Sequence, residues 1–314
     1  MPDDEPFPLL PISCDATIRK CRELPLRGTD VFVCSYPKSG TTWMQHILHT
    51  LATNGESPLP HISDACPFFE VDRTWAAGSD ELTEAVQTNH KAINRRIFNT
   101  HLLWSMMPKS HPDARYVYMV RQGVDTCVSF YHHLSHQAEA DGGFLGALPD
   151  FVGAWTGGEI AFGSWSAHLK AWLGSDAATD PRVLIVPYEA LRADPKTWVA
   201  KVNAHCRFGV SDARIDELLP RFSFEWMRAN EAVFEPRSVR WVKRAGDDDA
   251  AAGDGAAFHF IRAGRVGDGE KAFDSPAERA LLLSMVRRSF PTGAIPEYVM
   301  ERLPMAVRAD CARE

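Results

Sequence analysis

The stretch from 31 to 52, VFVCSYPKSGTTWMQHILHTLA, constrains the fold more than any other part of the chain. The run at 31–34 is apolar throughout, which is typical of a strand buried in a parallel sheet that is covered on both faces. Apolar residues then return with helical spacing between Met44 and Leu51. The stretch therefore predicts a buried strand, a tight polar loop over 35–42, and a helix.

The polar loop carries groups that bind an anion. Gly40 lets the backbone approach a ligand closely, Thr41 and Thr42 offer hydroxyl groups, and Lys38 adds a positive charge. Backbone amides at the start of the helix would complete a cradle for phosphate or sulfate. The structural alternative is a strand, turn and helix with an incidental lysine.

The order of residues in this loop argues against the usual nucleotide-triphosphate loop. There the lysine follows the second glycine and precedes Ser or Thr, whereas here Lys38 precedes Gly40. Neither GxxxxGKS nor GxxxxGKT occurs anywhere in the chain. A kinase that binds ATP with magnesium is therefore disfavoured.

A second strand, loop and helix follow over residues 115–134. The strand is predicted at 116–120, with Arg121 at its carboxyl end. Ligands bind at the carboxyl ends of strands in open α/β sheets, so Arg121 is placed to meet one. Ser129 lies one to two turns into the helix and offers a hydroxyl to the same anion. A surface arginine and an incidental serine are the alternative.

Two groups of histidines need separate interpretation. His101 follows a short predicted strand, and a lone histidine in that position is more often structural than catalytic. His132 and His136 are spaced as two metal ligands on a helix would be, but no third ligand with suitable spacing follows. A polar helix end or the edge of a substrate pocket is favoured over a metal site.

Composition excludes several classes of protein. The 314 residues carry a formal net charge of −7, which argues against a general binder of nucleic acid or membrane surfaces. The 7 cysteines are odd in number and include no CxxC pair, which favours a reduced intracellular protein. The acidic N-terminus has no secretory signal, and no apolar run is long enough to cross a bilayer. We therefore expect a cytoplasmic protein.

The loop motif YPKSGTTW at 36–43 resembles the 5′-phosphosulfate loop of the soluble sulfotransferases. These enzymes take sulfonate from 3′-phosphoadenosine 5′-phosphosulfate (PAPS) and release adenosine 3′,5′-bisphosphate. The resemblance implies that the donor is held by Lys38, Ser39, Gly40, Thr41, Thr42 and Trp43. It also implies that Lys38 stabilises the leaving phosphate, and that no metal is required.

Further motifs along the chain resemble the same family in order and spacing. The Thr-His pair at 100–101 implies that His101 is the catalytic base, and the pair of Arg121 and Ser129 implies a 3′-phosphate site. The family resemblance extends to a tyrosine after the strand at 183–186, to a Ser-Phe-x-x-Met segment, and to an Arg-Lys-Gly signature. The remaining donor-binding residues that this implies are Tyr188, Ser223, Phe224, Met227, Arg262, Ala263 and Gly264.

Three positions depart from the family pattern. Asn99 stands where the family often has a lysine two residues before the histidine, Ala263 replaces the lysine of the Arg-Lys-Gly signature, and Gly269 replaces a tryptophan. Lost positive charge would weaken nucleotide binding unless Arg265 compensates. A non-catalytic relative that binds PAPS or adenosine 3′,5′-bisphosphate therefore stays as the alternative to an enzyme.

The expected organisation is a single α/β domain with a central parallel sheet flanked by helices. We expect a loosely structured arm over 1–30, the sulfotransferase domain over 31–295 with a last helix at 276–290, and a C-terminal tail over 296–314. Loops near 67–70, 137–160 and 245–257 are expected to build the acceptor pocket.

The acceptor is expected to be a small-molecule alcohol or phenol, with an amine as second choice. Several aromatic residues suggest a largely apolar pocket, although each also suits an ordinary core: Phe68, Phe69, Trp75, Trp104, Phe144 and Trp155. No dimer signature of the animal enzymes follows residue 270, so the oligomeric state stays open.

Overall fold

The computed structural model describes residues 7–243, 259–292 and 294–311. Its centre is a parallel sheet of 4 strands in the order β2-β1-β3-β4. The strands are β1 (Val31–Ser35), β2 (Ile97–Thr100), β3 (Arg115–Val120) and β4 (Val183–Pro187). β1 and β3 are buried along their whole length, as a sheet covered on both faces requires.

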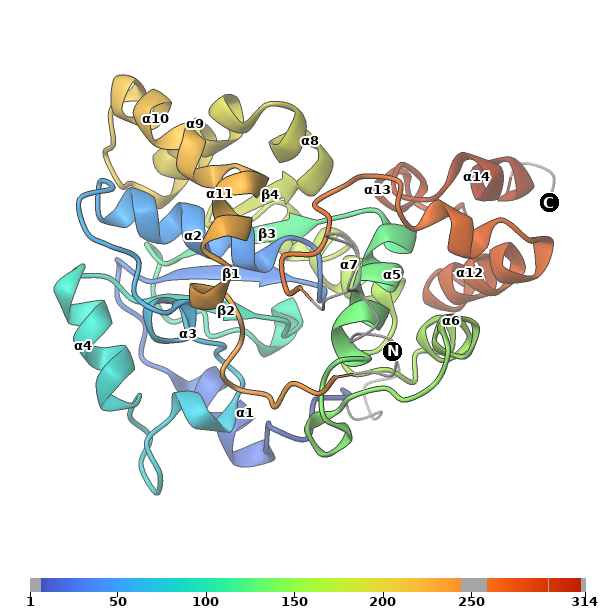
Figure 1. Ribbon diagram of the computed structural model, residues 1–314, viewed down its shortest axis with the longest axis horizontal. Helices are drawn as coiled ribbons and strands as arrows, with labels where there is room; N and C mark the ends of the chain where they lie inside the picture. The colour runs from blue at the N-terminus through green and yellow to red at the C-terminus, as the bar shows by residue number, and fades with distance from the viewer. Residues whose placement is uncertain (1–6, 244–258, 293, 312–314) are drawn as a thin grey trace.

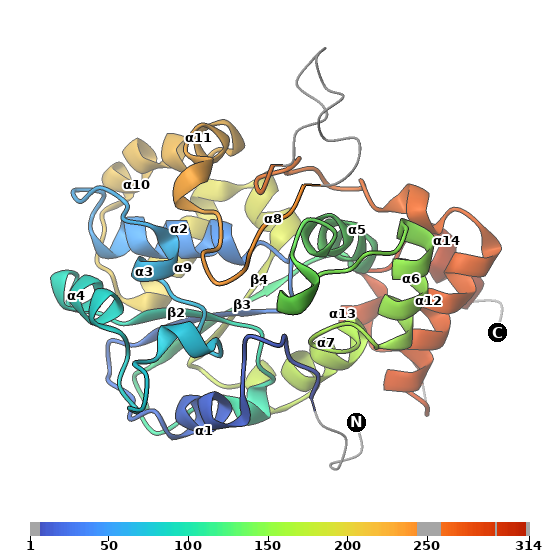
Figure 2. The same ribbon diagram turned by 60° about the horizontal axis from the view of Figure 1, so that its bottom comes forward.

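Helices cover both faces of the sheet (Figures 1 and 2). The α-helices are α1 (Asp15–Glu23), α2 (Thr41–Ala52), α3 (Ile62–Ala65), α4 (Glu84–Ala92), α5 (Gly123–Leu134), α6 (Leu148–Gly157), α7 (Trp165–Leu173), α8 (Tyr188–Ala193), α9 (Pro195–Cys206), α10 (Asp212–Leu218), α11 (Phe224–Ala229), α12 (Pro276–Ser289), α13 (Glu297–Met300) and α14 (Met305–Cys311). Short 3-10 turns are η1 (Asp72–Thr74), η2 (Trp104–Met106), η3 (Glu139–Asp141), η4 (Asp176–Ala178), η5 (Leu219–Phe222), η6 (Glu231–Val233) and η7 (Glu270–Phe273).

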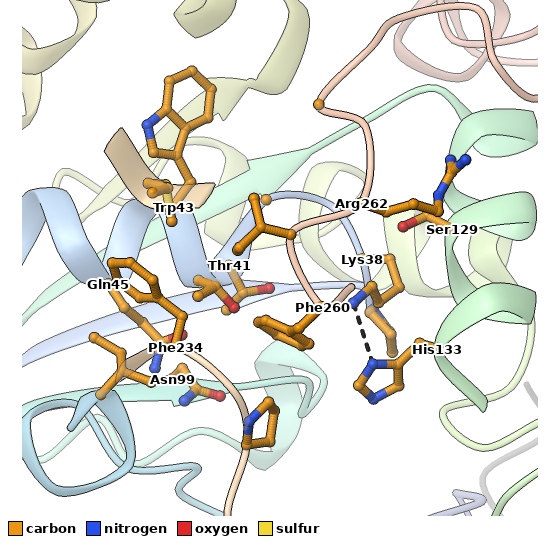
Figure 3. Close-up of a pocket in the computed structure, with 18 of the residues that line it drawn as sticks. Lys38, Thr41, Trp43, Gln45, Asn99, Ser129, His133, Phe234, Phe260 and Arg262 are labelled. Atoms are coloured by element: carbon orange, nitrogen blue, oxygen red, sulfur yellow. Dashed lines mark hydrogen bonds between the residues drawn. The ribbon is translucent and has the colours of Figure 1, made fainter. Parts of the chain in front are cut away.

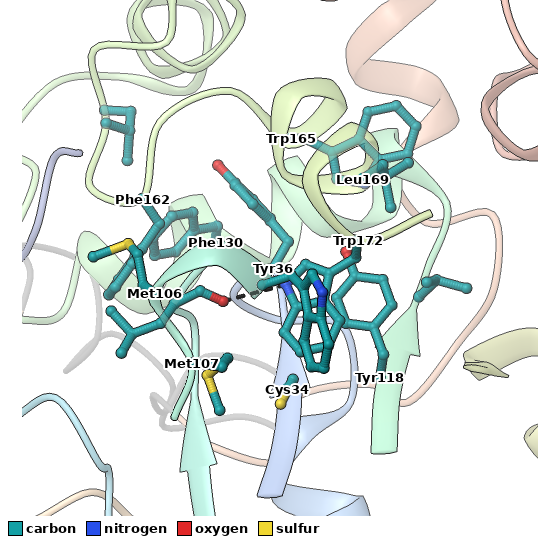
Figure 4. Packing of buried hydrophobic residues seen from close by; sticks show 14 of the residues in the cluster. Cys34, Tyr36, Met106, Met107, Tyr118, Phe130, Phe162, Trp165, Leu169 and Trp172 are labelled. Atoms are coloured by element: carbon teal, nitrogen blue, oxygen red, sulfur yellow. Dashed lines mark hydrogen bonds between the residues drawn. The ribbon is translucent and has the colours of Figure 1, made fainter. Parts of the chain in front are cut away.

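The alternation of side chains along the strands divides the core in two. Val31 and Val33 of β1 pack in one cluster with residues of α2, α9 and α10. Phe32 and Cys34 point to the other face and pack in a second cluster with residues of α1, α5, α6 and α7. Figure 4 shows part of the second cluster, in which Tyr118 stacks on Trp172 at 4.6 Å between ring centroids.

The sequence-based expectations hold for the strands and for the helices that follow them. The predicted strand, loop and helix at 31–52 form β1 and α2, and the second unit at 115–134 forms β3 and α5. Ser35 ends β1 directly before the polar loop, and its register with β3 pairs it with Met119. Both loops therefore leave the sheet at the same edge, as the carboxyl ends of adjacent parallel strands must.

Three expectations about irregular segments differ from the structure. The N-terminal arm was expected to be loosely structured, but it contains α1, whose Ile18 and Cys21 are buried in the core. The expected loop at 137–160 contains α6, with Phe151 and Trp155 buried. The C-terminal tail forms α13 and α14, which bury Val299 and Val307. The expected loop at 245–257 lies outside the described residues.

The last helix of the expected domain is present as α12. Leu282, Met285 and Val286 are buried, whereas Leu281 is 43% exposed. Across the described part of the chain, none of the helices combines the length and apolarity needed to cross a membrane.

Candidate active site

The polar loop after β1 forms the floor of a cavity of about 500 Å³. Gly40 is the N-cap of α2 and has φ +99°, a conformation that favours glycine. A Cβ atom there would lie 2.8 Å from Cδ2 of Tyr188, so any residue with a side chain would also clash at this position. The loop is thus shaped to bring backbone close to a ligand, as an anion cradle at a helix N-terminus requires.

The cavity gathers nearly all of the residues that the sequence predicted for a donor site. Ser39 is the exception, because it is 1% exposed and does not line the cavity. The predicted residues that line it are Lys38, Gly40, Thr41, Thr42, Trp43, His101, Arg121, Ser129, Tyr188, Ser223, Phe224, Met227, Arg262, Ala263 and Gly264. Figure 3 shows Lys38, Ser129 and Arg262 at one end, away from Gln45 and Asn99.

Arg121 is held rigidly at the end of β3. Its two terminal nitrogens donate to the backbone carbonyls of Lys38 and Arg265, at 3.0 and 3.1 Å, and its guanidinium lies 4.5 Å from the ring centroid of Tyr188. A carboxylate oxygen of Asp125 lies 3.7 Å from one of these terminal nitrogens. The buried Nε has no hydrogen-bond partner among the described residues. An unpaired buried donor on a fixed cation suits an anionic ligand.

The segment that carries Arg262 is fastened to α5 through Asp125. The Asp125 carboxylate accepts hydrogen bonds from the backbone N–H groups of Gly267 and Gly269, at 2.9 and 2.8 Å. A Cβ atom at Gly269 would lie 2.2 Å from the backbone of Val124. The tryptophan expected there from the family pattern therefore has no room, and the segment lies directly against the helix backbone.

His101 is positioned through its ring and its backbone. Nδ1 lies 2.8 Å from the carbonyl oxygen of Ser35, which accepts only, so Nδ1 carries the proton and Nε2 is the basic nitrogen of the neutral ring. The backbone N–H donates to Glu70 at 2.6 Å. Burial, together with the charge of Lys38, lowers the pKa of His101 to about 4. The imidazole is therefore neutral at pH 7.

Lys38 lies in an aromatic corner of the cavity. Its backbone has φ +66°, and Nζ is 3.3 Å from Nδ1 of His133 and 4.7 Å from the ring centroid of Phe260. Figure 3 shows the contact with His133. Burial, and then the charges of Arg121 and Arg262, lower the pKa of Lys38 to about 7. Burial also holds the pKa of His133 well below its usual value, so this ring accepts a hydrogen bond from the ammonium.

Aromatic side chains form the other wall. Trp43 donates from Nε1 to the carbonyl of Phe222 at 2.9 Å and meets the Tyr188 ring edge-on at 5.6 Å. Gly264 lies against Phe224, because a Cβ atom there would be 2.6 Å from Cδ2 of that ring. Flat aromatic surfaces of this kind suit a purine.

Several lining residues were not predicted from the sequence. Phe162 is one of them, and it contacts the His101 ring at 5.0 Å between centroids, next to Phe68 at 5.1 Å, which was considered for the acceptor pocket. The backbone of Phe162 has φ +69°, and a pattern of apolar residues in the sequence does not reveal a residue in such a conformation. His133, Phe260 and Gln137 also line the cavity, and none of them was singled out as a site residue. Within the described ranges, no group of three or more His, Cys, Asp or Glu residues is arranged to hold a metal ion.

Most of the aromatic residues considered for the acceptor pocket belong to the core. Phe69, Trp75, Trp104 and Trp155 are at most 5% exposed and do not line the cavity. Phe68 does line it, beside His101.

Comparison with known proteins gives these residues a family. Residues 28–280 match the family model described as the sulfotransferase domain. Sulfotransferase 1E1 of Homo sapiens is 29% identical over 212 residues, which are 66% of this chain and 69% of that protein. Sulfotransferase 1C2 of Oryctolagus cuniculus is 28% identical over 253 residues, 78% of this chain and 77% of that protein.

Two solved structures share the fold. Mouse sulfotransferase SULT7A1 complexed with PAP has a TM-score of 0.64 at 20% identity, covering 92% of this chain and 95% of that chain. A retinol dehydratase in complex with retinol and PAP has a TM-score of 0.66 at 20% identity, covering 90% and 88%. Because the family model spans most of the sequence, the chain belongs to the sulfotransferase family.

Proposed function

We propose that the cavity binds PAPS and that His101 and Lys38 carry the transfer of its sulfonate group to a small-molecule acceptor. The family is that of a sulfonate-transferring enzyme. One observation carries the assignment of the residues. The histidine after β2 and the anion cradle after β1 line the same cavity, although they are far apart in the sequence.

His101 is suited to act as the base. The Nδ1–H group is engaged by Ser35, so Nε2 takes the proton of the acceptor hydroxyl or amine. A low pKa keeps the ring neutral and ready to accept that proton at pH 7. PAPS supplies the sulfonate, since the acceptor–sulfur bond forms as the bond from sulfur to the 5′-phosphate oxygen breaks, leaving adenosine 3′,5′-bisphosphate.

Lys38 and the loop amides of residues 39–42 would stabilise the negative charge that develops on the leaving phosphate oxygen. Preorganised donors in a partly buried site are worth more than the same donors in water. Asn99 is neutral where the family often has a lysine, and its Nδ2 donates to the carbonyl of Cys66 at 3.0 Å. Lys38 therefore carries a larger share of the charge stabilisation.

Arg121, Ser129 and Arg262 are proposed to bind the 3′-phosphate, which separates PAPS from ATP. Ala263 contributes no charge. Arg265 also lines the cavity, and its position supports the compensating role considered for it. The unpaired Nε of Arg121 supports an anion at this end. Trp43 and Phe224 are proposed to hold the adenine, together with Tyr188, Ser223 and Met227.

The acceptor is proposed to be an alcohol, phenol or amine with an apolar body. Phe68 and Phe162 both contact the His101 ring and lie 6.3 Å from each other, and Leu10 and Leu134 line the same cavity. A nucleophile at His101 would therefore be carried by an apolar group.

The compartment is proposed to be the cytoplasm. All 7 cysteines are free, and 5 of them are buried. Free thiols in this number suit a reducing environment.

Transfer of radiolabelled sulfonate from PAPS tests the proposal. We expect wild-type protein to sulfonate members of a panel of phenols, aliphatic alcohols, steroids and amines. His101→Ala should lower kcat by about 10²- to 10⁴-fold and Lys38→Ala by about 10²- to 10³-fold. His111→Ala, which changes a histidine outside the cavity, is the matched control and should retain the rate.

The same experiment separates the enzyme from a non-catalytic relative. Tight binding of adenosine 3′,5′-bisphosphate without transfer to any acceptor would support the non-catalytic alternative. Transfer that His101→Ala leaves intact would remove the histidine from its proposed role.

A further inference from the structure

Gln137 is a buried polar residue in the part of the cavity that is otherwise apolar. It follows α5, is 1% exposed and lines the cavity together with Leu10 and Leu134. Leu10 and the Gln137 amide are neighbours. A Cβ atom at Gly142 would lie 2.6 Å from Cδ2 of Leu10 and 3.6 Å from Nε2 of Gln137. The proposed function assigns this residue no role.

The orientation of the Gln137 amide is fixed by its surroundings. Nε2 donates to the backbone carbonyl of Asp141. Because a carbonyl oxygen only accepts hydrogen bonds, the NH₂ group of the amide must face Asp141, and Oε1 must face the other way. Asp141 is itself anchored, because its carboxylate accepts three hydrogen bonds from Arg240. The backbone N–H of Gln137 donates to Leu134 at 3.2 Å. The side chain therefore has little freedom to turn.

This fixed orientation leaves Oε1 without a hydrogen-bond partner among the described residues. A buried acceptor that stays unpaired costs about 1–3 kcal/mol, so unpaired groups of this kind are rare in native proteins. At the wall of a ligand cavity, such an atom gives preference to a ligand that brings a donor.

We propose that Gln137 selects acceptors that carry a second hydrogen-bond donor, a hydroxyl or N–H group, away from the hydroxyl that is sulfonated. The inference rests on the proposed function, because the first hydroxyl is taken to lie at His101. The substrate class is then an apolar molecule with two polar ends: one hydroxyl meets His101, and the other donor meets Oε1 of Gln137.

Matched pairs of phenols test this selection. Each pair has a rigid aromatic body with a distal hydroxyl in one member and a methoxy group in the other, which accepts but does not donate. Three spacers are used: benzene, naphthalene and biphenyl. For each pair, kcat/KM is measured for wild type and for Gln137→Leu, and the diphenol is corrected for its twofold number of nucleophiles.

We expect wild type to prefer the diphenol by about 10- to 100-fold for the spacer that fits. Gln137→Leu should bring that ratio close to one and leave the affinity for adenosine 3′,5′-bisphosphate unchanged, which shows that the fold is intact. Gln87→Leu is the matched control. Its amide donates to Leu82 outside the cavity, so the ratio should stay at the wild-type value.

A wild-type ratio near one for every spacer, or a preference that survives in Gln137→Leu, would overturn the proposal while leaving sulfonate transfer intact. If no phenol is sulfonated although the nucleotide binds, the proposed function fails instead. In that case calorimetry of the same pairs, in the presence of adenosine 3′,5′-bisphosphate, decides the role of Gln137. Equal affinity of both members for wild type would refute it.

Discussion

Lys38 differs from an ordinary surface lysine in its basicity. Burial is the main cause, and Arg121 and Arg262 add to it, so that the pKa of its ammonium is lowered to about 7. A large fraction of Lys38 is therefore neutral in the free protein at pH 8. An anionic ligand interacts favourably only with the charged form, so binding at this site takes up a proton.

The pH dependence of nucleotide binding tests this interpretation of Lys38. The affinity for adenosine 3′,5′-bisphosphate should fall by up to about tenfold per pH unit above pH 7, because an increasing part of the binding energy is needed to protonate Lys38. Titration calorimetry in buffers of different ionisation enthalpy measures the proton uptake directly. Lys38→Arg keeps its charge at all these pH values and should show a much flatter profile. Equal slopes for the two proteins would refute the assignment.

At the scale of elements, the segment at 262–269 packs closely against α5 beside the cavity. Asp125 holds the segment through two backbone N–H groups, and Gly269 lets it approach the helix backbone. Arg262, which is proposed to bind the 3′-phosphate, belongs to this segment. Displacing the segment from α5 should therefore weaken nucleotide binding.

Gly269→Ala is the substitution that tests this contact. The new Cβ would meet the Val124 backbone at 2.2 Å, so the segment must shift. We expect a loss of about 1–3 kcal/mol in the free energy of unfolding and a loss of about tenfold in nucleotide affinity. Gly153→Ala in α6 is the control, because nothing lies within 4 Å of its Cβ. It should keep the affinity and stabilise the protein slightly. An unchanged affinity in Gly269→Ala would show that the segment does not position the nucleotide site.

The elements that the sequence predicted well are those with strong periodicity. Continuous apolar runs indicated the strands. Asp194 followed by Pro195 is likewise a typical helix start, and in α9 the Asp194 carboxylate accepts from the Thr197 backbone N–H at 3.1 Å. α6 was missed because its sequence, LPDFVGAWTG, contains three residue types that disfavour or mask a helix pattern: proline, glycine and threonine. Its stability comes from burying Phe151 and Trp155, one turn apart, and that tertiary contact is invisible in composition.

The C-terminal helices were expected to be a tail outside the domain, and their packing can be tested with one pair of variants. Leu303 lies between α13 and α14 and is 1% exposed, whereas Met305 is 82% exposed. Leu303→Ala should lower the free energy of unfolding by about 2–5 kcal/mol, because it leaves a cavity in the core. Met305→Ala should change it by less than about 0.5 kcal/mol. Chemical denaturation measures both values, and equal effects would show that this end of the chain is not part of the cooperative unit.

At the scale of the whole molecule, the site depends on topology more than on any one motif. Parallel strands place Lys38 and Arg121 at the same edge of the sheet, and β2 brings His101 there as well. That edge could be predicted from the strand pattern. The loop near 137–160 was expected at the acceptor pocket, but neither Gln137 nor Phe162 could be singled out, because each reaches the cavity from a segment whose path is set by backbone contacts. The Phe162 N–H donates to Pro8 from the N-terminal segment, for example.

The described part of the chain also contains several buried histidines whose rings are neutral at pH 7. Burial lowers the pKa of His46, His49, His90 and His101 to about 4, and that of His168 to about 3. Their usual pKa in an unfolded chain is about 6.5. Between these values the unfolded state binds more protons than the folded state, so the free energy of unfolding decreases as the pH falls from 7 toward 4.

One buried carboxyl group opposes this trend without reversing it. Burial raises the pKa of Glu70 to about 7, so this group is protonated in the folded state before it is in the unfolded state. Protonation of Glu70 therefore stabilises the folded protein as the pH falls from 7 toward the usual pKa of a glutamate. This single group stands against the five histidines named above and against His133, whose pKa burial also lowers.

Thermal unfolding across pH 7.5 to 5 therefore measures the balance of these buried groups. Each net proton contributes about 1.4 kcal/mol per pH unit, so several kcal/mol should be lost between pH 6.5 and pH 5.5, and Tm should fall by roughly 5–15 °C. His49→Gln removes one of the five histidines at a position away from the cavity and should make the fall less steep by about one proton. Glu70→Gln removes the opposing group and should make it steeper. A Tm that stays constant or rises as the pH is lowered would show that these imidazoles take up protons in the folded state.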